Sequence, residues 1–218
     1  MEHNTDIIPL QHRYNTVYNP RLKVLIACEF SGIVREAFKA KGHDAWSCDL
    51  LPTDIPGNHI QGDVLDVLNE KWDLMIAHPP CTHLSVSGAK HFKKKVDVQK
   101  EAISFFMEFV NCKIPKYAIE NPVGIMSTHY RKPDQIIQPY HFGDPFQKTT
   151  CLWLKGLPKL YHLSTGEFSD NRHLIDHGEM MICPSGKKIA KWYSLNKSAK
   201  IRSTTFPGIA NAFASQWG

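Results

Sequence analysis

The sequence predicts an α/β protein built on a doubly wound, mixed and mostly parallel sheet of the Rossmann type. Short apolar runs alternate with segments whose apolar residues recur at helical spacing, as expected when strands alternate with helices. The polar residues of greatest interest follow the ends of these runs, where such sheets bind ligands. With 218 residues, the chain has the length of one domain. We expect an N-terminal extension over residues 1–21 and a single domain over 22–218, with a small insert at about 156–200.

The first quarter of the chain predicts a strand, a turn, a helix and a second strand. The apolar run "KVLIACE" (23–29) is typical of a strand buried in a parallel sheet. The chain then breaks at Ser31 and Gly32 and continues with the apolar spacing of an amphipathic helix. The segment "DAWSCD" (44–49) predicts the second strand, which closes on the acid Asp49.

The remaining elements continue this alternation. The strongest strand signal is the apolar centre of "WDLMIAHPPC" (72–81), which ends in two prolines and a cysteine. The closing segment "PGIANAFASQW" (207–217) predicts a helix. The other predicted elements are a short strand within 59–67, a helix over 98–112, a strand over 116–122 and a strand over 150–154.

Composition and charge limit the class of protein. The formal charge of +5 and a pI near 8.8 fit a polyanionic partner, and the densest basic cluster is Lys93, Lys94 and Lys95. The chain has no run of the ~20 apolar residues that a membrane span needs. Its first 21 residues lack the apolar core of a secretory signal, and its six cysteines show no CxxC spacing. We therefore expect a cytoplasmic protein with reduced thiols, neither secreted nor membrane-bound.

The turn after the first strand suits a cofactor that contains a nucleoside. A glycine turn lets backbone N–H groups approach a ligand, and Asp49 after the second strand is placed to bind ribose hydroxyls. The turn lacks the full GxGxxG pattern, which favours a ligand bound through adenosine and a short charged tail over a dinucleotide. An ordinary turn between a strand and a helix would show the same short pattern.

A thiol and a carboxylic acid follow two strands that we expect to be neighbours. Cys81 ends the first of these strands and Glu120 ends the second. A thiolate that adds to C6 of cytosine pushes negative charge toward N3, where a carboxylic acid can supply a proton, and C5 then becomes nucleophilic. His78 and His83 flank the thiol and are candidates for tuning its pKa. The pair predicts covalent catalysis on a pyrimidine ring.

With these residues in place, the chain resembles the cytosine-C5 methyltransferases that use S-adenosylmethionine. The resemblance implies the Rossmann-like methyltransferase fold and runs in chain order from about residue 22 to residue 217. Its motifs are "FSG" (30–32), Asp49, "GDV" (62–64), "PPCTHLS" (79–85), "ENP" (120–122), "FGDPFQKTTCLWLKG" (142–156) and "RSTTFPGIANAFASQW" (202–217). Of these, the cysteine and glutamate motifs are specific in themselves.

The resemblance also implies a set of site residues and partners. The substrate would be DNA, in which Cys81 attacks the base and Glu120 contacts N3. The implied catalytic residues are Cys81, Glu120, Asn121 and Lys148. The implied residues for S-adenosylmethionine are Glu29, Phe30, Ser31, Gly32, Asp49, Leu50, Asp63, Val64, Pro79 and Asn211. The implied contacts to nucleic acid are Ser85, Lys93, Lys94 and Lys95.

The chain departs from the family's pattern at several positions. Ile33 and Val34 stand where the cofactor loop usually has a second glycine, and proline stands at 122 in place of valine. Lys148 and Thr150 match two arginines of the family's later motif. Only residues 156–200 remain for a sequence-reading region. This length predicts a short or loose sequence preference.

Several alternatives stay open. The same chemistry could act on RNA or on a free cytosine nucleotide, or use a modified sulfonium donor that transfers a larger group. A silent binding module that keeps the fold is a different class of protein. Transfer to an amino group of adenine or cytosine is disfavoured by His78 and Cys81 around the two prolines. We expect no metal site, because His162, His173, His177 and Cys183 match no common zinc motif, and the oligomeric state is left open.

Overall fold

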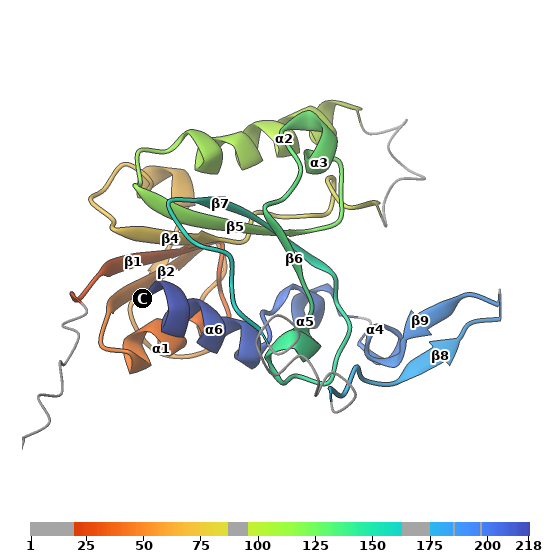
Figure 1. Cartoon of the computed structure of the whole chain (residues 1–218). Helices are drawn as coiled ribbons and strands as arrows, with labels where there is room; N and C mark the ends of the chain where they lie inside the picture. Colours follow the sequence, from red (N-terminus) through yellow and green to blue (C-terminus); the bar gives the residue numbers. More distant parts are fainter. Residues whose placement is uncertain (1–19, 87–95, 163–174, 185, 197) are drawn as a thin grey trace, which may run out of the picture.

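A computed structural model of the chain describes residues 20–86, 96–162, 175–184, 186–196 and 198–218. A seven-stranded sheet with the order β3-β2-β1-β4-β5-β7-β6 forms its centre, and a separate two-stranded sheet, β8-β9, lies to one side (Figure 1). The predicted α/β class and mostly parallel sheet are confirmed. The N-terminal extension expected over 1–21 falls almost wholly outside the described residues.

The sheet is parallel from β3 to β5 and antiparallel at β7. The chain order reverses between β1 and β4, and this reversal makes the switch point at which doubly wound sheets bind ligands. β7 pairs antiparallel with both β5 and β6. The strands are β1 (Lys23–Ala27), β2 (Asp44–Asp49), β3 (His59–Gln61), β4 (Leu74–Ala77), β5 (Lys116–Pro122), β6 (Gln135–Ile137) and β7 (Thr150–Lys155).

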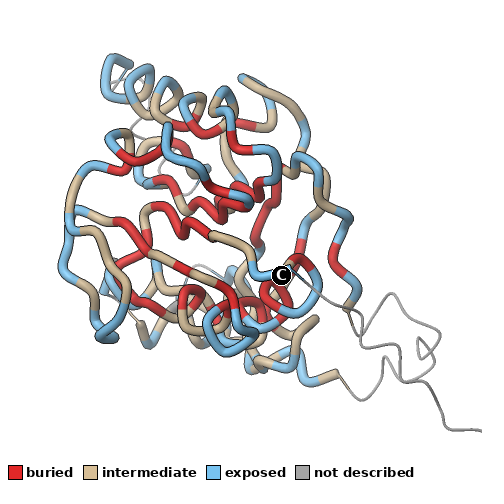
Figure 2. Tube along the Cα trace, turned by 90° about the vertical axis from the view of Figure 1, so that its left-hand side faces the viewer, coloured by how far each residue is buried: buried red, intermediate tan, exposed pale blue. Residues whose placement is uncertain are grey.

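Helices cover both faces of the sheet, which explains why its strands are apolar without alternation. Val24 and Ile26 of β1 pack on the side of α1 and α6, whereas Leu25 and Ala27 pack on the side of α2. Figure 2 shows the buried positions concentrated along the strands and the inward sides of the helices. The main helices are α1 (Ile33–Ala40), α2 (Val96–Asn111), the short α3 (Met126–His129) and α6 (Pro207–Trp217).

The expected insert contains a small hairpin and two short helices. β8 (Met180–Ile182) and β9 (Lys188–Ala190) pair antiparallel and project away from the main sheet (Figure 1). α4 (Lys191–Leu195) and α5 (Ala199–Ser203) then lead back toward α6. In the part of the chain that the structure describes, no helix has both the length and the apolar character of a membrane span.

Candidate active site

The carboxyl ends of β4 and β5 place His78 and Glu120 side by side. The register pairs Ala77 with Ile119, and both of these side chains lie in the core on the α2 side. Because side chains alternate along a strand, the next residues of the two strands, His78 and Glu120, turn to the opposite face. Nδ1 of His78 and Oε2 of Glu120 are 3.3 Å apart, within hydrogen-bond distance. The chain therefore brings together two side chains that are 42 residues apart.

Glu120 is a mostly buried carboxylate surrounded by groups that favour its ionised form. Burial acts to raise its pKa, but the hydrogen bond from His78, the positive charge of Lys148 and a hydrogen bond from Thr150 act in the other direction. The net pKa of Glu120 is lower than that of an ordinary glutamate. The carboxylate is therefore ionised at neutral pH.

Cys81 lies at the start of a tight turn that follows the two prolines. Its carbonyl oxygen accepts hydrogen bonds from the N–H groups of Leu84 and Ser85, at 3.0 and 2.9 Å. Burial raises the pKa of the Cys81 thiol, and so does the negative charge of Glu120, whereas the charges of Lys148 and Arg202 lower it. The net pKa lies above the usual 9.0, so the thiol holds its proton at neutral pH.

The turn that carries Cys81 is fastened to the chain that follows β5. Ser85 forms an antiparallel bridge with Gly124, and the N–H of Ile125 donates to the carbonyl of Leu84 at 2.9 Å. This approach is so close that a Cβ on Gly124 would lie 2.3 Å from the carbonyl oxygen of Leu84. A glycine at 124 thus allows the cysteine turn and the glutamate strand to meet. Ser85, an expected nucleic-acid contact, has its backbone in this bridge.

Asn121 joins the two motifs through a buried hydrogen bond. Its amide Nδ2 donates to the carbonyl of Pro79 at 2.7 Å, and the residue is only 2% exposed. An expected catalytic residue is therefore bonded to an expected cofactor residue. Its Oδ1 is buried and has no hydrogen-bond partner among the described residues. The contact shows that Asn121 holds the proline turn in place.

Lys148 connects the site to the last part of the chain. Its Nζ donates to the carbonyl of Thr204 at 3.4 Å and lies 5.8 Å from the ring centroid of Phe206. Its charge acts on both Cys81 and Glu120. The expected catalytic residues Cys81, Glu120 and Lys148 thus share one electrostatic environment. They come from three separate parts of the chain.

The first turn holds α1 through the carboxylate of Glu29. This buried carboxylate accepts hydrogen bonds from the N–H groups of Val34 and Arg35, at 2.7 and 3.2 Å, and from the hydroxyl of Ser31 at 3.0 Å. It therefore caps the N-terminus of α1, where negative charge is favoured. Gly32 adopts a left-handed backbone, with φ of 77°. Glu29 was expected at the cofactor, and the structure shows that its side chain shapes the turn.

Two of the expected cofactor acids lie near one another at the ends of the outer strands. Oδ1 of Asp49 accepts from the N–H of Leu51, and Oδ1 of Asp63 accepts from the N–H of Leu65. Burial and the negative charges of these two aspartates raise the pKa of Cys48 to about 11. The two carboxylates therefore form one acidic region beside the switch point.

The other expected cofactor residues differ in exposure. Leu50 is 72% exposed beside Asp49, whereas Val64 is 4% exposed and packs in the core on the α2 side. Phe30 is mostly buried and lies under the ammonium of Lys200, 5.1 Å from its ring centroid. Asn211 is exposed on α6. A ligand can thus reach the side chain of Leu50 but not that of Val64.

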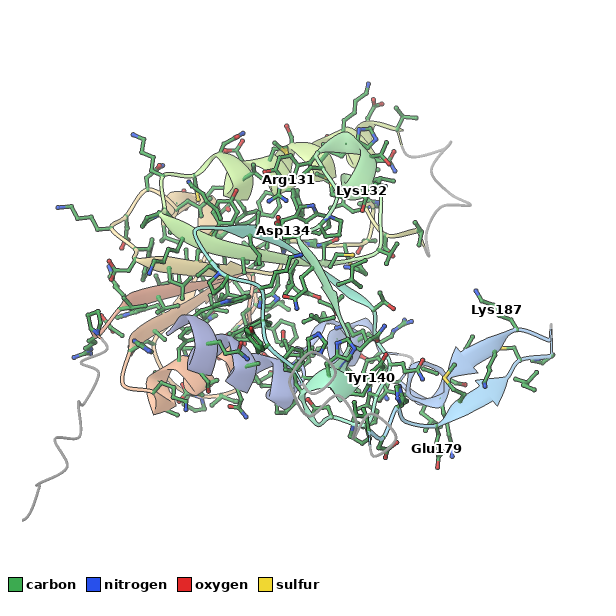
Figure 3. The ribbon with its side chains drawn as sticks, viewed as in Figure 1. Arg131, Lys132, Asp134, Tyr140, Glu179 and Lys187 are labelled. Carbon is green, nitrogen blue, oxygen red and sulfur yellow. The ribbon has the colours of Figure 1, made fainter. Side chains whose placement is uncertain are left out.

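The described histidines of the insert contact aromatic rings. His162 stacks on His141 with ring centroids 4.0 Å apart, and His177 lies 4.2 Å from Tyr140, which Figure 3 shows between the sheet and the hairpin. Burial, together with His162 and His177, lowers the pKa of His141 to about 4. No three His, Cys, Asp or Glu side chains among the described residues could hold a metal ion.

Some expected site residues lie outside the description, and some neighbours of the site were not expected. Lys93, Lys94 and Lys95 lie outside the described residues, as does His173. The structure adds Arg202 as a charge that acts on Cys81, and it adds Thr150 as a partner of Glu120. No local pattern in the sequence indicates these contacts, because they depend on how β7 and α5 pack against the site.

No protein-family model matches the sequence, and no curated protein matches it. The fold and the site alone define the class of protein. This is a doubly wound α/β protein with a protonated thiol and an ionised carboxylate at the ends of two adjacent strands. An acidic region lies at the ends of the neighbouring strands of the same sheet.

Proposed function

We propose that this protein transfers a methyl group from S-adenosylmethionine to C5 of cytosine in DNA, through a covalent intermediate on Cys81. The observation that supports the proposal is the shared environment of Cys81 and Glu120, in which the negative charge of the carboxylate acts on the thiol. The fold supports it, since a parallel sheet with an antiparallel seventh strand fits the mixed sheet expected of the methyltransferase fold.

The protonation states of the site suit this addition. Attack of Sγ on C6 forms the sulfur–carbon bond and places negative charge on the ring at N3. Cys81 gives up one proton and N3 takes up one, so the ionised Glu120 can receive the first and deliver the second. The addition then needs no net proton from solvent.

The later steps return the site to its starting state. C5 becomes nucleophilic after the addition and would form a bond to the methyl carbon as the bond from that carbon to the sulfonium sulfur breaks. A base then removes the C5 proton, the sulfur–carbon bond breaks and the 5,6 double bond of the ring is restored. Cys81 leaves as a thiolate whose negative charge is favoured by Lys148 and Arg202, and the proton on N3 returns through Glu120 to this thiolate. When bound, S-adenosylmethionine supplies an electrophilic methyl group.

The residues at the ends of β1 to β3 fit an adenosine. Asp49 and Asp63 each offer a carboxylate oxygen as a hydrogen-bond acceptor, and the exposed Leu50 offers an apolar surface to a base. These residues would hold the cofactor on the side of the sheet next to Cys81.

The hairpin supports a nucleic-acid substrate through its position and charge. A cavity of about 350 Å³ lies between the segment 147–149 and the hairpin, and its wall includes Lys148 and Lys188. Lys187 and Glu179 lie on opposite edges of the hairpin (Figure 3), and Glu179 forms an ion pair with Lys191. A base inside duplex DNA must leave the stack to reach Cys81, at a cost of ~ a few kcal/mol that such contacts must offset.

The decisive experiment is to trap the covalent intermediate. The protein is incubated with S-adenosylmethionine and random-sequence DNA in which every cytosine is replaced by 5-fluorocytosine, so that the target sequence need not be known. Fluorine at C5 blocks the final elimination. We expect a covalent protein–DNA species by intact mass, and after nuclease digestion a peptide in which Cys81 carries a methylated fluorocytosine nucleotide.

The controls decide between the alternatives. Cys81→Ala should form no adduct while still binding S-adenosylmethionine, because the thiol belongs to the chemistry and not to the adenosine region. Single-stranded DNA, RNA and free nucleotide with the same fluorinated base test the other substrates. If no substrate gives an adduct although the cofactor binds, the proposed chemistry is wrong and a silent binding module is favoured.

A further inference from the structure

The imidazole of His78 is buried against the catalytic carboxylate and uses only one of its two nitrogens. Its side chain is 9% exposed, and Nδ1 lies 3.3 Å from Oε2 of Glu120. Nε2 is buried and has no hydrogen-bond partner among the described residues. Among the described residues, the imidazole therefore forms its hydrogen bond toward Glu120.

The backbone fixes the place of this imidazole. The N–H of His78 donates to the carbonyl of Ala27 at 2.9 Å, which continues the pairing of β4 with β1. The next residue, Pro79, is held by Asn121 through its carbonyl. The backbone is therefore anchored on both sides of the His78 side chain, and the burial of this side chain leaves the imidazole little room to turn away from Glu120.

The contacts also assign the proton of the ring. An ionised Glu120 only accepts hydrogen bonds, so Nδ1 must carry the hydrogen that joins the two groups. A second hydrogen on Nε2 would be a buried donor without an acceptor in the described surroundings, which is costly. A bare Nε2 costs less. We therefore assign the hydrogen of this contact to Nδ1.

We propose that His78 is a positioning residue for Glu120, whose Nδ1–H holds Oε2 so that the carboxylate presents one fixed edge to the base. This inference rests on the proposed function, because it names how that site orients its carboxylate toward N3 of the cytosine. The sequence predicted His78 as a candidate for tuning Cys81. The structure instead pairs it with Glu120.

Other charged or titratable groups also face Glu120 and must stay in place in any test. Cys81 comes from the same turn as His78, Lys148 precedes β7 and Cys151 lies within β7. Arg202 of α5 acts on Cys81 and so on the same pair. A His78 variant leaves all four of these groups unchanged, which isolates the effect of the imidazole.

Three variants separate positioning from simple filling of space. The amide nitrogen of asparagine lies as many bonds from Cα as Nδ1, whereas that of glutamine lies as many bonds from Cα as Nε2. His78→Asn therefore keeps a hydrogen-bond donor at the position of Nδ1, which contacts Glu120. His78→Gln moves the donor to the position of Nε2, which has no partner among the described residues, and His78→Ala removes the donor. Thermal unfolding of each variant checks that it folds.

The first measurement does not depend on turnover. The carboxyl carbon of Glu120 in ¹³C-labelled protein is titrated by NMR and assigned with Glu120→Gln. His78→Ala and His78→Gln should raise the pKa of Glu120, because they remove a hydrogen bond to the ionised form. His78→Asn should leave it close to that of the unchanged protein. An equal pKa in all four proteins would overturn the inference.

The second measurement is the rate of adduct formation on fluorinated DNA as a function of DNA concentration. His78→Ala and His78→Gln should lower the maximal rate by ~10-fold or more, since general acid–base groups contribute ~10²–10⁴-fold when well placed. The half-saturating DNA concentration should change little, and His78→Asn should restore most of the rate. Equal losses in all three variants would overturn the inference. Absence of any adduct in the unchanged protein would instead refute the proposed function, and the NMR titration would still decide whether His78 holds Glu120.

Discussion

At the scale of single residues, the site is defined by a protonated thiol at Cys81 and a negatively charged carboxylate at Glu120. The proton is on Cys81, whose pKa is raised by burial and by Glu120. The charge is on Glu120, whose pKa is lowered by His78, Lys148 and Thr150 against the effect of burial. Each group controls the other, because removal of the charge from Glu120 makes the thiolate of Cys81 easier to form. Transfer of a proton from Cys81 to Glu120 would therefore form the thiolate and the protonated carboxylic acid in the same step.

This coupling predicts that Glu120→Gln speeds the alkylation of Cys81. In the unchanged protein the thiol is protonated at pH 8, and the rate should rise only as the pH passes 9.0 and approaches the raised pKa. The uncharged glutamine removes the charge that raises this pKa, so the thiolate forms at lower pH. A shift of one pKa unit changes the thiolate fraction at pH 8 by ~10-fold. The measurement is the rate of iodoacetamide labelling of Cys81 by peptide mass spectrometry.

The matched control for this prediction is Lys148→Met, which removes a positive charge from the same site. Its effect should have the opposite sign, because the charge of Lys148 lowers the pKa of Cys81. Labelling of Cys112, which lies at the far end of β5 and near Lys155, should not change in either variant. Slower labelling of Cys81 in Glu120→Gln would show that the charge of Glu120 does not govern the thiol.

At the scale of elements, two short segments that follow β4 and β5 must pack against each other for the site to exist. The turn after Cys81 meets the chain after Asn121 at Ser85 and Gly124. The pairing of the two strands brings their ends together, but the bridge fixes the direction of the turn. The cysteine motif and the glutamate motif are thus parts of one structural unit.

Gly124→Ala should damage this unit. The added Cβ would lie 2.3 Å from a backbone oxygen of Leu84, so the turn itself would have to move. Overpacking of this kind costs ~1–3 kcal/mol in the free energy of unfolding, and adduct formation should fall because Cys81 is displaced. Gly62→Ala is the control, since nothing lies within 4 Å of the added carbon. Urea unfolding measures the cost, and equal stability of the two variants would contradict the close approach.

At the scale of the whole molecule, the last segments of the chain return to the site. Lys200 of α5 forms an ion pair with Asp54 at 2.7 Å and lies over Phe30, while α6 packs against α1. Lys148 donates a hydrogen bond to the carbonyl of Thr204, which lies between α5 and α6. The segment from Lys200 to Thr204 therefore contacts both the turn after β1 and Lys148.

We expect S-adenosylmethionine to stabilise the folded protein. A ligand that binds only the folded state adds ~2.7 kcal/mol to the free energy of unfolding at 100 times its dissociation constant. Asp49→Asn should lose most of this effect, because it replaces an acceptor in the acidic region. Asp44→Asn, at the other end of β2, should keep it, and so should Cys81→Ala. Thermal unfolding with and without the ligand measures the effect. An equal loss in both aspartate variants would contradict the prediction that the adenosine binds at the end of β2 that carries Asp49.

The sequence alone was sufficient for the main elements of the fold. The predicted strands at 23–29, 44–49, 116–122 and 150–154 correspond to β1, β2, β5 and β7, and both later helices are confirmed. β6, β8 and β9 were not predicted, because each has only three residues and too short an apolar pattern to be distinguished from a loop. Local periodicity thus indicated every long element, and among the three-residue strands it indicated β3 but not β6, β8 or β9.

For the site, the sequence by itself determined that Cys81 and Glu120 follow two buried strands, since apolar runs and the residues that end them are local features. Only the tertiary structure decided that His78 meets Glu120 and that Lys148, Thr150 and Arg202 set the charge of the pair. These contacts depend on the register of strands 42 residues apart and on the packing of the insert against the sheet. Neither the register nor the packing can be predicted from the spacing of neighbouring residues, because both depend on how surfaces far apart in the sequence fit together.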